Sequence, residues 1–200
     1  MPRFRSLKTA VRNWFRSSGW SASSPLPPEC QDTAPITLVQ PLFACLPEGG
    51  QMTERAAFAL GGVINRLYAV SPEDAKNVVR RFMWHMNEES GNIGWGIPEA
   101  FGEALAQCPP LADTYRRVLL HYIYDAPDNK STGFCDHAPL RISCYTAIAR
   151  LLAARPEFTA EALPLLRISA EQETDTACRE AAQKLVRRYM LTAFTPQEKI

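Results

Sequence analysis

Residues 71–86, SPEDAKNVVRRFMWHM, contain the pattern that decides the fold. Their apolar residues recur at the spacing that places side chains on one face of an α-helix. These residues are Ala75, Val78, Val79, Phe82 and Met86. Ser71, followed by Pro72 and then Asp74, is typical of a helix start. The stretch therefore predicts an amphipathic helix that begins at Pro72.

The same periodicity continues on both sides of this helix. Further apolar faces of helical spacing span 56–67, 97–105, 111–123, 140–152 and 178–189. Pro41 is expected in the first turn of a short helix that ends near Cys45, and Pro164 is expected to interrupt a helix over 157–168. No stretch after residue 50 alternates with a period of two, so the chain is predicted to be all-α.

The predicted helices form pairs at a nearly regular interval. Pairs begin near residues 52, 97, 138 and 174. An interval of about 40 residues is typical of HEAT-type repeats, in which each pair buries its apolar face against its neighbours. We therefore expect an α-α superhelix, a HEAT-like solenoid of about three to four helix pairs. An antiparallel bundle would accommodate the same helices but would leave the interval unexplained.

A resemblance to a known family supports this fold. The segment 84–105, WHMNEESGNIGWGIPEAFGEAL, and the segment 136–141, DHAPLR, resemble a bacterial family of HEAT-like repeat proteins that is grouped with the phycobilisome-lyase-type HEAT repeats. More loosely, the resemblance extends from about Val39 to Met190. It implies the repeat fold and a non-enzymatic role. Nothing in the sequence marks a bilin site, so no lyase activity is carried over.

The chain divides into four predicted regions. Residues 1–18 form a basic amphipathic helix, and 19–34, rich in serine and proline, form a linker. Residues 35–192 form the helical repeat domain, and 193–200 form a C-terminal tail. Residues 1–30 contain five basic residues against one acidic residue, whereas the rest of the chain has 17 basic and 20 acidic residues.

The basic N-terminal helix has three possible interpretations. It caps the folded body or hangs loosely from it, it lies on a membrane surface, or it is an organellar transit peptide. In the membrane interpretation, aromatic side chains would sit among lipid headgroups and basic side chains would contact phosphates. The residues involved would be Arg3, Arg5, Lys8, Arg12, Trp14 and Phe15.

Two segments that connect successive pairs, 88–96 and 127–137, are expected to lie side by side, because such connections emerge on the same side of a solenoid. We call this side the loop edge. Aromatic and charged residues gather there in a pattern typical of a protein-binding surface. They are Trp84, Glu88, Glu89, Trp95, Asp136, His137 and Arg141. In the structural alternative, both tryptophans pack between repeats and the charges pair locally.

These observations favour a non-catalytic scaffold or adaptor that binds a protein partner through the loop edge or the concave face. The alternative is a small-ligand-binding protein or enzyme that uses Glu88, Glu89, Trp95, Asp136 and His137. No nucleophile motif, metal-ligand spacing or dinucleotide fingerprint is present, so neither cofactor nor metal is expected.

The overall composition favours a cytoplasmic protein with no nucleic-acid partner. The net charge is only +1, and no apolar run approaches the roughly 20 residues that span a bilayer. The six cysteines form no C-x-x-C pair and are expected to be reduced core residues. Peripheral contact of residues 1–18 with a membrane remains the alternative for location.

Overall fold

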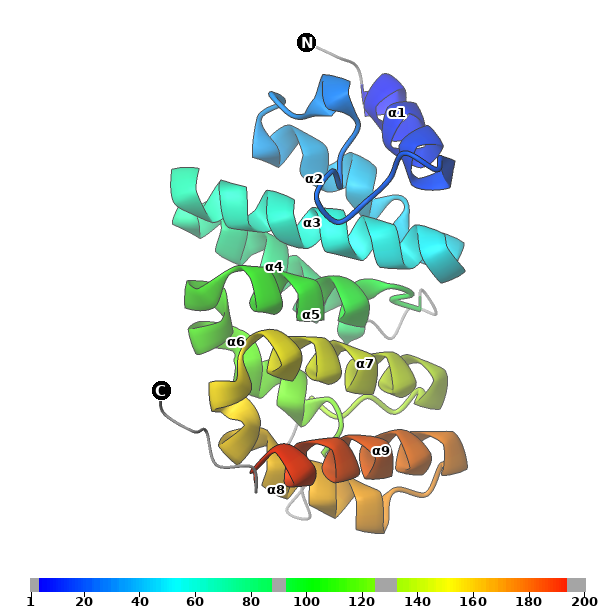
Figure 1. The fold of residues 1–200 in the computed structure, drawn as a ribbon, viewed down its shortest axis with the longest axis vertical. Helices are drawn as coiled ribbons and strands as arrows, with labels where there is room; N and C mark the ends of the chain where they lie inside the picture. The colour runs from blue at the N-terminus through cyan, green and yellow to red at the C-terminus, as the bar shows by residue number, and fades with distance from the viewer. Residues whose placement is uncertain (1–3, 88–92, 125–132, 194–200) are drawn as a thin grey trace.

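The computed structural model describes residues 4–87, 93–124 and 133–193, and these residues are helical with short connections (Figure 1). They contain no strand, only an isolated bridge between Ser21 and Ser24. The all-α prediction is confirmed. The helices are α1 (Phe4–Arg16), α2 (Pro35–Phe43), α3 (Gly50–Val70), α4 (Pro72–Met86), α5 (Ile97–Gln107), α6 (Pro109–His121), α7 (Ala138–Ala154), α8 (Thr159–Gln172) and α9 (Thr176–Ala193), with 3₁₀ turns η1 (Pro28–Cys30), η2 (Leu46–Glu48) and η3 (Pro156–Phe158).

The helices α3, α5, α7 and α9 stack in chain order as one layer and run in the same direction (Figure 1). Helices α4, α6 and α8 lie behind them as a second layer. Within the stack α3 contacts α5, α5 contacts α7, and α7 contacts α9. The stacked helices begin at Gly50, Ile97, Ala138 and Thr176, close to the starts predicted from the sequence. These contacts are consistent with a helical repeat.

Two glycines allow the stacked helices to approach closely. A Cβ added to Gly61 of α3 would lie 2.8 Å from the backbone oxygen of Glu103 on α5. A Cβ added to Gly102 of α5 would lie 2.7 Å from the Cα of Ala147 on α7. Both distances are shorter than atoms tolerate, so these positions set the spacing of the stack.

Helix α1 packs against α2 and α3 at one end of the stack. Its apolar face, formed by Leu7, Val11 and Phe15, is buried. The indole Nε1 of Trp14 donates a hydrogen bond to the backbone oxygen of Ser24, 3.1 Å away. This is the arrangement expected of a capping helix. The prediction that Phe15 sits among lipid headgroups is wrong, because Phe15 forms part of the protein core.

Polar contacts also fasten α1 to the body. Arg12 pairs with Glu48 of η2, and Arg55 of α3 donates to the backbone oxygens of Phe15 and Ser17. The side chain of Arg5 is exposed. Of the membrane-surface candidates, Lys8 is half-buried, and Arg3 lies outside the described residues.

Residues 19–34 do not separate α1 from the body as an open linker would. Leu26 and Cys30 are buried in the main core, and the ring of Trp20 contacts Phe58 of α3 with 6.1 Å between centroids. The guanidinium of Arg55 lies over the same indole, 4.8 Å from its centroid. Apolar and aromatic contacts therefore join this segment to α3, which a composition rich in serine and proline does not reveal.

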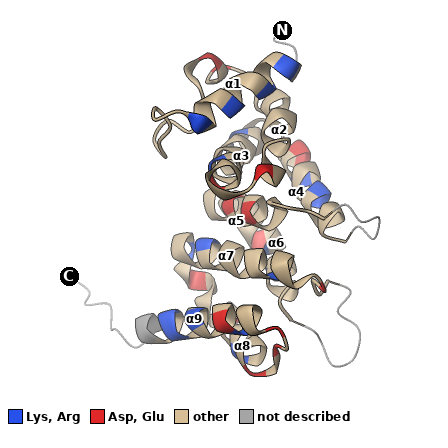
Figure 2. Cartoon of the chain, turned by 90° about the vertical axis from the view of Figure 1, so that its right-hand side faces the viewer, with Lys and Arg blue, Asp and Glu red and all other residues tan. Residues whose placement is uncertain are grey.

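Basic residues recur on α1 and α9, the two ends of the stack (Figure 2).

Candidate functional site

The described parts of the loop edge, residues 93–96 and 133–137, meet between α5 and α7. The rings of Trp95 and His137 are in edge-to-face contact, with 5.6 Å between their centroids. Trp95 immediately precedes the N-cap of α5, and His137 is the N-cap of α7. The predicted proximity of these two connections is confirmed for this pair.

The backbone before α5 explains why Trp95 is held at the edge. Gly96 has a φ of 76°, and a Cβ there would lie 2.5 Å from the backbone oxygen of Leu46. Only glycine combines this conformation with so close an approach. The N–H of Trp95 donates to Ile93, and that of Ile97 donates to Gly94. These bonds leave the Trp95 side chain 41% exposed.

A hollow of about 450 Å³ opens beside Trp95, and we call it the Trp95 hollow. It is lined by η2, by the N-terminal parts of α3 and α5, and by the middle of α7. Its lining residues are Leu46, Pro47, Gly49, Gly50, Thr53, Glu54, Trp95, Gly96, Glu99, Ser143 and Thr146. Two of these side chains are carboxylates and none is a Lys, Arg or His. The hollow therefore presents negative charge beside an exposed aromatic ring.

Glu99 differs from the paired carboxylates of the described chain. Its Oε2 atom is shielded from solvent and has no hydrogen-bond partner. By contrast, Glu48, Glu103, Glu161 and Glu173 each accept from an arginine. A buried carboxylate oxygen without a donor is unfavourable in an isolated chain, so the Glu99 carboxylate is a candidate acceptor for a ligand.

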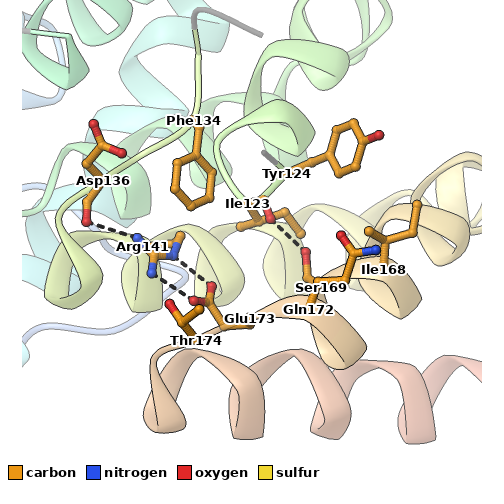
Figure 3. A pocket seen from close by; sticks show the side chains of 10 residues that line it. All are labelled: Ile123, Tyr124, Phe134, Asp136, Arg141, Ile168, Ser169, Gln172, Glu173 and Thr174. Carbon is orange, nitrogen blue, oxygen red and sulfur yellow. Dashed lines mark hydrogen bonds and ion pairs between the residues drawn. The ribbon is translucent and has the colours of Figure 1, made fainter. Parts of the chain in front are cut away.

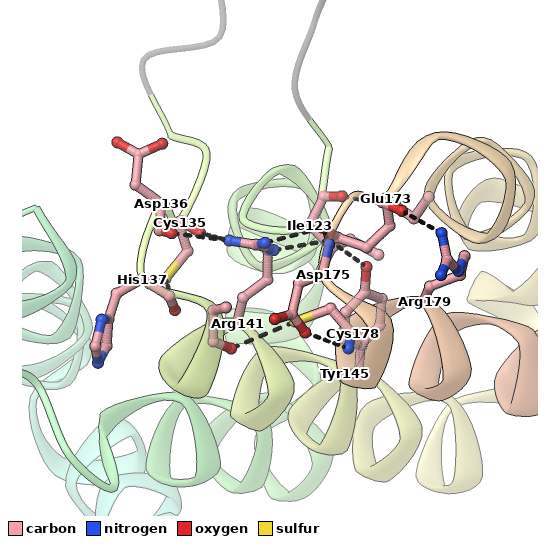
Figure 4. A network of polar contacts seen from close by, with 12 residues as sticks. Ile123, Cys135, Asp136, His137, Arg141, Tyr145, Glu173, Asp175, Cys178 and Arg179 are labelled. Atoms are coloured by element: carbon pink, nitrogen blue, oxygen red, sulfur yellow. Dashed lines mark hydrogen bonds and ion pairs between the residues drawn. The ribbon is translucent and has the colours of Figure 1, made fainter.

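Arg141 does not belong to the exposed surface, and its prediction as a partner-binding residue is wrong. Its Nε and NH2 atoms donate to the two carboxylate oxygens of Glu173, at 2.8 and 2.9 Å. Its NH1 atom donates to the backbone oxygens of Cys135 and Asp136 (Figure 4). The Phe134 ring lies 4.8 Å from the guanidinium carbon. Arg141 instead fastens the loop edge to the connection between α8 and α9.

A second cavity, of about 310 Å³, is lined in part by this ion pair (Figure 3). Phe134, Arg141 and Glu173 line one part of it, and Tyr124 and Gln172 line another. The carboxylate of Glu173 also accepts from the Tyr145 hydroxyl and from the backbone N–H of Asp175. The charges of Arg141 and Glu173 are satisfied by each other, which leaves Asp136 as the lining carboxylate that no described residue pairs. The cavity therefore offers a ligand fewer unpaired charges than the Trp95 hollow does.

The remaining predicted residues lie apart or outside the described chain. Trp84 is 74% exposed and lines a separate hollow of about 500 Å³ with Arg80, Arg81, Met83 and Asn87. Asp136 is exposed beside His137. Glu88 and Glu89 lie outside the described residues.

Sequence reasoning missed Glu54, Glu99, Ser143 and Thr146 as neighbours of Trp95. The sequence does indicate that Ser143 and Thr146 lie together, because residues three apart share a face of a helix. The proximity of Glu54 to Glu99 depends on how α3 and α5 align in the stack. No pattern within either helix predicts that alignment.

The six cysteines are free and buried. Burial raises the pKa of Cys45 to about 11 and that of Cys178 to about 12, so these thiols are protonated at neutral pH.

Among the described residues, no group of three or more His, Cys, Asp or Glu side chains could hold a metal ion. In the same part of the chain, no helix has the length and apolar character needed to cross a bilayer.

Comparisons of the chain with protein-family models, with curated proteins and with solved structures found no match. The described residues form an all-α protein of stacked helices.

Proposed function

We propose that this chain is a HEAT-like α-α superhelix that acts as a non-catalytic scaffold or adaptor and binds a protein partner through the loop edge. Open stacks of helices present extended surfaces to partners and need no catalytic group. The free, buried thiols support a reducing compartment, which is the cytoplasm in this proposal.

The observation that carries the proposal is the exposed Trp95 ring, braced by His137 beside a hollow. A half-exposed tryptophan next to a concavity is typical of residues that dominate binding energy at protein interfaces. Gly96 and the first turn of α5 fix its position, so little side-chain entropy would be lost on binding. Asp136 adds a charged rim.

Two matched variants of the full chain test the proposal. Trp95→Ala removes the ring at the loop edge, and Trp84→Ala removes an exposed tryptophan from α4. Each is used with the wild type as bait in its native cell, copurifying proteins are quantified by mass spectrometry, and candidates are purified for direct binding. We expect a partner that binds wild type and Trp84→Ala and is lost with Trp95→Ala. A partner lost only with Trp84→Ala, or none affected by Trp95→Ala, would reject the proposal.

A further inference from the structure

The chemistry of the Trp95 hollow indicates which kind of partner group enters it. We propose that the hollow binds an arginine side chain presented by the partner protein, with Glu54 and Glu99 as acceptors and Trp95 as the aromatic wall. This inference rests on the proposed function and adds the chemistry of the partner.

Neither carboxylate is paired with another described residue. Glu54 is exposed, and no hydrogen bond or ion pair joins it to another described residue. Glu99 is half-buried in the lining of the hollow, and its Oε2 is shielded from solvent and lacks a donor, so a guanidinium reaches that atom when the carboxylate turns toward the hollow. A guanidinium carries five N–H donors and no acceptor, so it matches a lining that offers acceptors and no competing cation.

An anion is a poorer match to this hollow, although helix N-termini often bind anions. In the first turn of α5, the N–H groups of Ile97 and Ala100 already donate to Gly94 and Gly96. Pro98 has no N–H group, so few donors remain for an anion. Both carboxylates would also repel a negatively charged group.

The other lining groups favour the same ligand. The hydroxyl of Thr146 donates to the backbone oxygen of Ile142 at 3.4 Å, which leaves its oxygen as an acceptor facing the hollow. An indole attracts cations through its π face, and the planar guanidinium both stacks on it and pairs with carboxylates. Arginine therefore fits better than lysine, whose ammonium is a compact, strongly hydrated charge.

Titration of the full chain with small probes tests the inference. The probes are N-acetyl-arginine amide, its neutral analogue N-acetyl-citrulline amide, N-acetyl-lysine amide and N-acetyl-glutamate amide. The readout is the indole N–H resonance of Trp95, assigned by its absence in Trp95→Phe. We expect saturable shifts with the arginine probe, weaker binding of the lysine probe, and little response to the citrulline and glutamate probes.

Three carboxylate variants provide the controls. Glu99→Gln and Glu54→Gln should each weaken the arginine probe about tenfold, as expected for loss of a charge-assisted hydrogen bond. Glu180→Gln, on the exposed surface of α9, removes the same charge elsewhere and should leave binding unchanged. Because Glu54 is exposed, Glu54→Gln keeps the test decisive if Glu99→Gln fails to fold.

Several results would overturn the inference. These are no response to the arginine probe, equal responses to the arginine and citrulline probes, tighter binding of the lysine or glutamate probe, or insensitivity to both hollow variants. A partner that is lost with Trp95→Ala but retained by Glu54→Gln and folded Glu99→Gln would reject the arginine assignment alone. A partner insensitive to Trp95→Ala would reject the proposed function itself.

Discussion

The side chains of Arg141 and Glu173 form a bidentate ion pair, 5% and 4% exposed, that joins α7 to the connection between α8 and α9. Because Arg141 also donates to the backbone oxygens of Cys135 and Asp136, the pair holds the loop edge against the last helices of the stack. The order of the loop edge therefore depends on an interaction away from the Trp95 hollow.

Removing one partner of this pair should destabilise the chain strongly. Arg141→Met or Glu173→Gln leaves the other group buried without its full complement of partners, at a cost of about 3–5 kcal/mol. Urea denaturation measures the loss. Glu73→Gln breaks an exposed pair with Arg80 and should change stability little. Equal small effects of the buried and exposed variants would show that the Arg141–Glu173 pair is not structural.

The same pair should make stability depend on acid pH. Burial tends to raise the pKa of Glu173, but hydrogen bonds from Arg141 and from the backbone of Asp175 outweigh it and hold that pKa below its ordinary value. The contribution is fully present above the unfolded pKa, about 4.3, and is lost as pH falls through the lower pKa of the folded state. Unfolding free energies between pH 7 and pH 2 should fall less steeply in Glu173→Gln than in wild type. Parallel curves would contradict this.

Adding a methyl group between α5 and α7 should weaken the stack. Gly102→Ala places a Cβ 2.7 Å from the Cα of Ala147, and such overpacking costs about 1–3 kcal/mol. Gly62→Ala is the matched control, since its nearest neighbour is the flexible Gln107 side chain and alanine favours helix formation. Thermal unfolding of both variants gives the comparison. A Gly102→Ala protein as stable as Gly62→Ala would refute the close packing of these helices.

Helix α1 should behave as part of the core. Phe15→Ala removes a buried ring and should cost about 3–5 kcal/mol. Phe4, which is 46% exposed on the same helix, provides the control, and Phe4→Ala should change the unfolding free energy by about 0.5 kcal/mol or less. If Phe15→Ala instead left stability intact, α1 would hang free of the body in solution.

The fold was largely predictable because helical periodicity is local. The sequence pattern predicted helix pairs that begin near residues 97 and 138, and α5 and α7 begin at Ile97 and Ala138. The effect of two prolines on the helices was predicted wrongly. Pro41 was expected in a first turn, but α2 begins at Pro35 and continues through it. Pro164 was expected to interrupt a helix, but α8 continues through it. A proline removes one N–H and crowds a carbonyl, but contacts with the rest of the protein override such local preferences.

The candidate site was predictable only where the repeat itself fixes positions. The contact of Trp95 with His137 follows from successive connections emerging on the same side. The burial of Arg141 does not, because Glu173 lies 32 residues away on the next connection. The sequence shows Arg141 as one more charge near a loop, and only the packed helices show that its partner is internal.

Hydrogen exchange of the full chain, with and without its purified partner, tests the proposed loop-edge interface most directly. We predict slower exchange on binding in residues 93–100 and 136–146, and unchanged exchange in α4 and α9. Protection confined to α4 around Trp84, with none at Trp95 and His137, would contradict it.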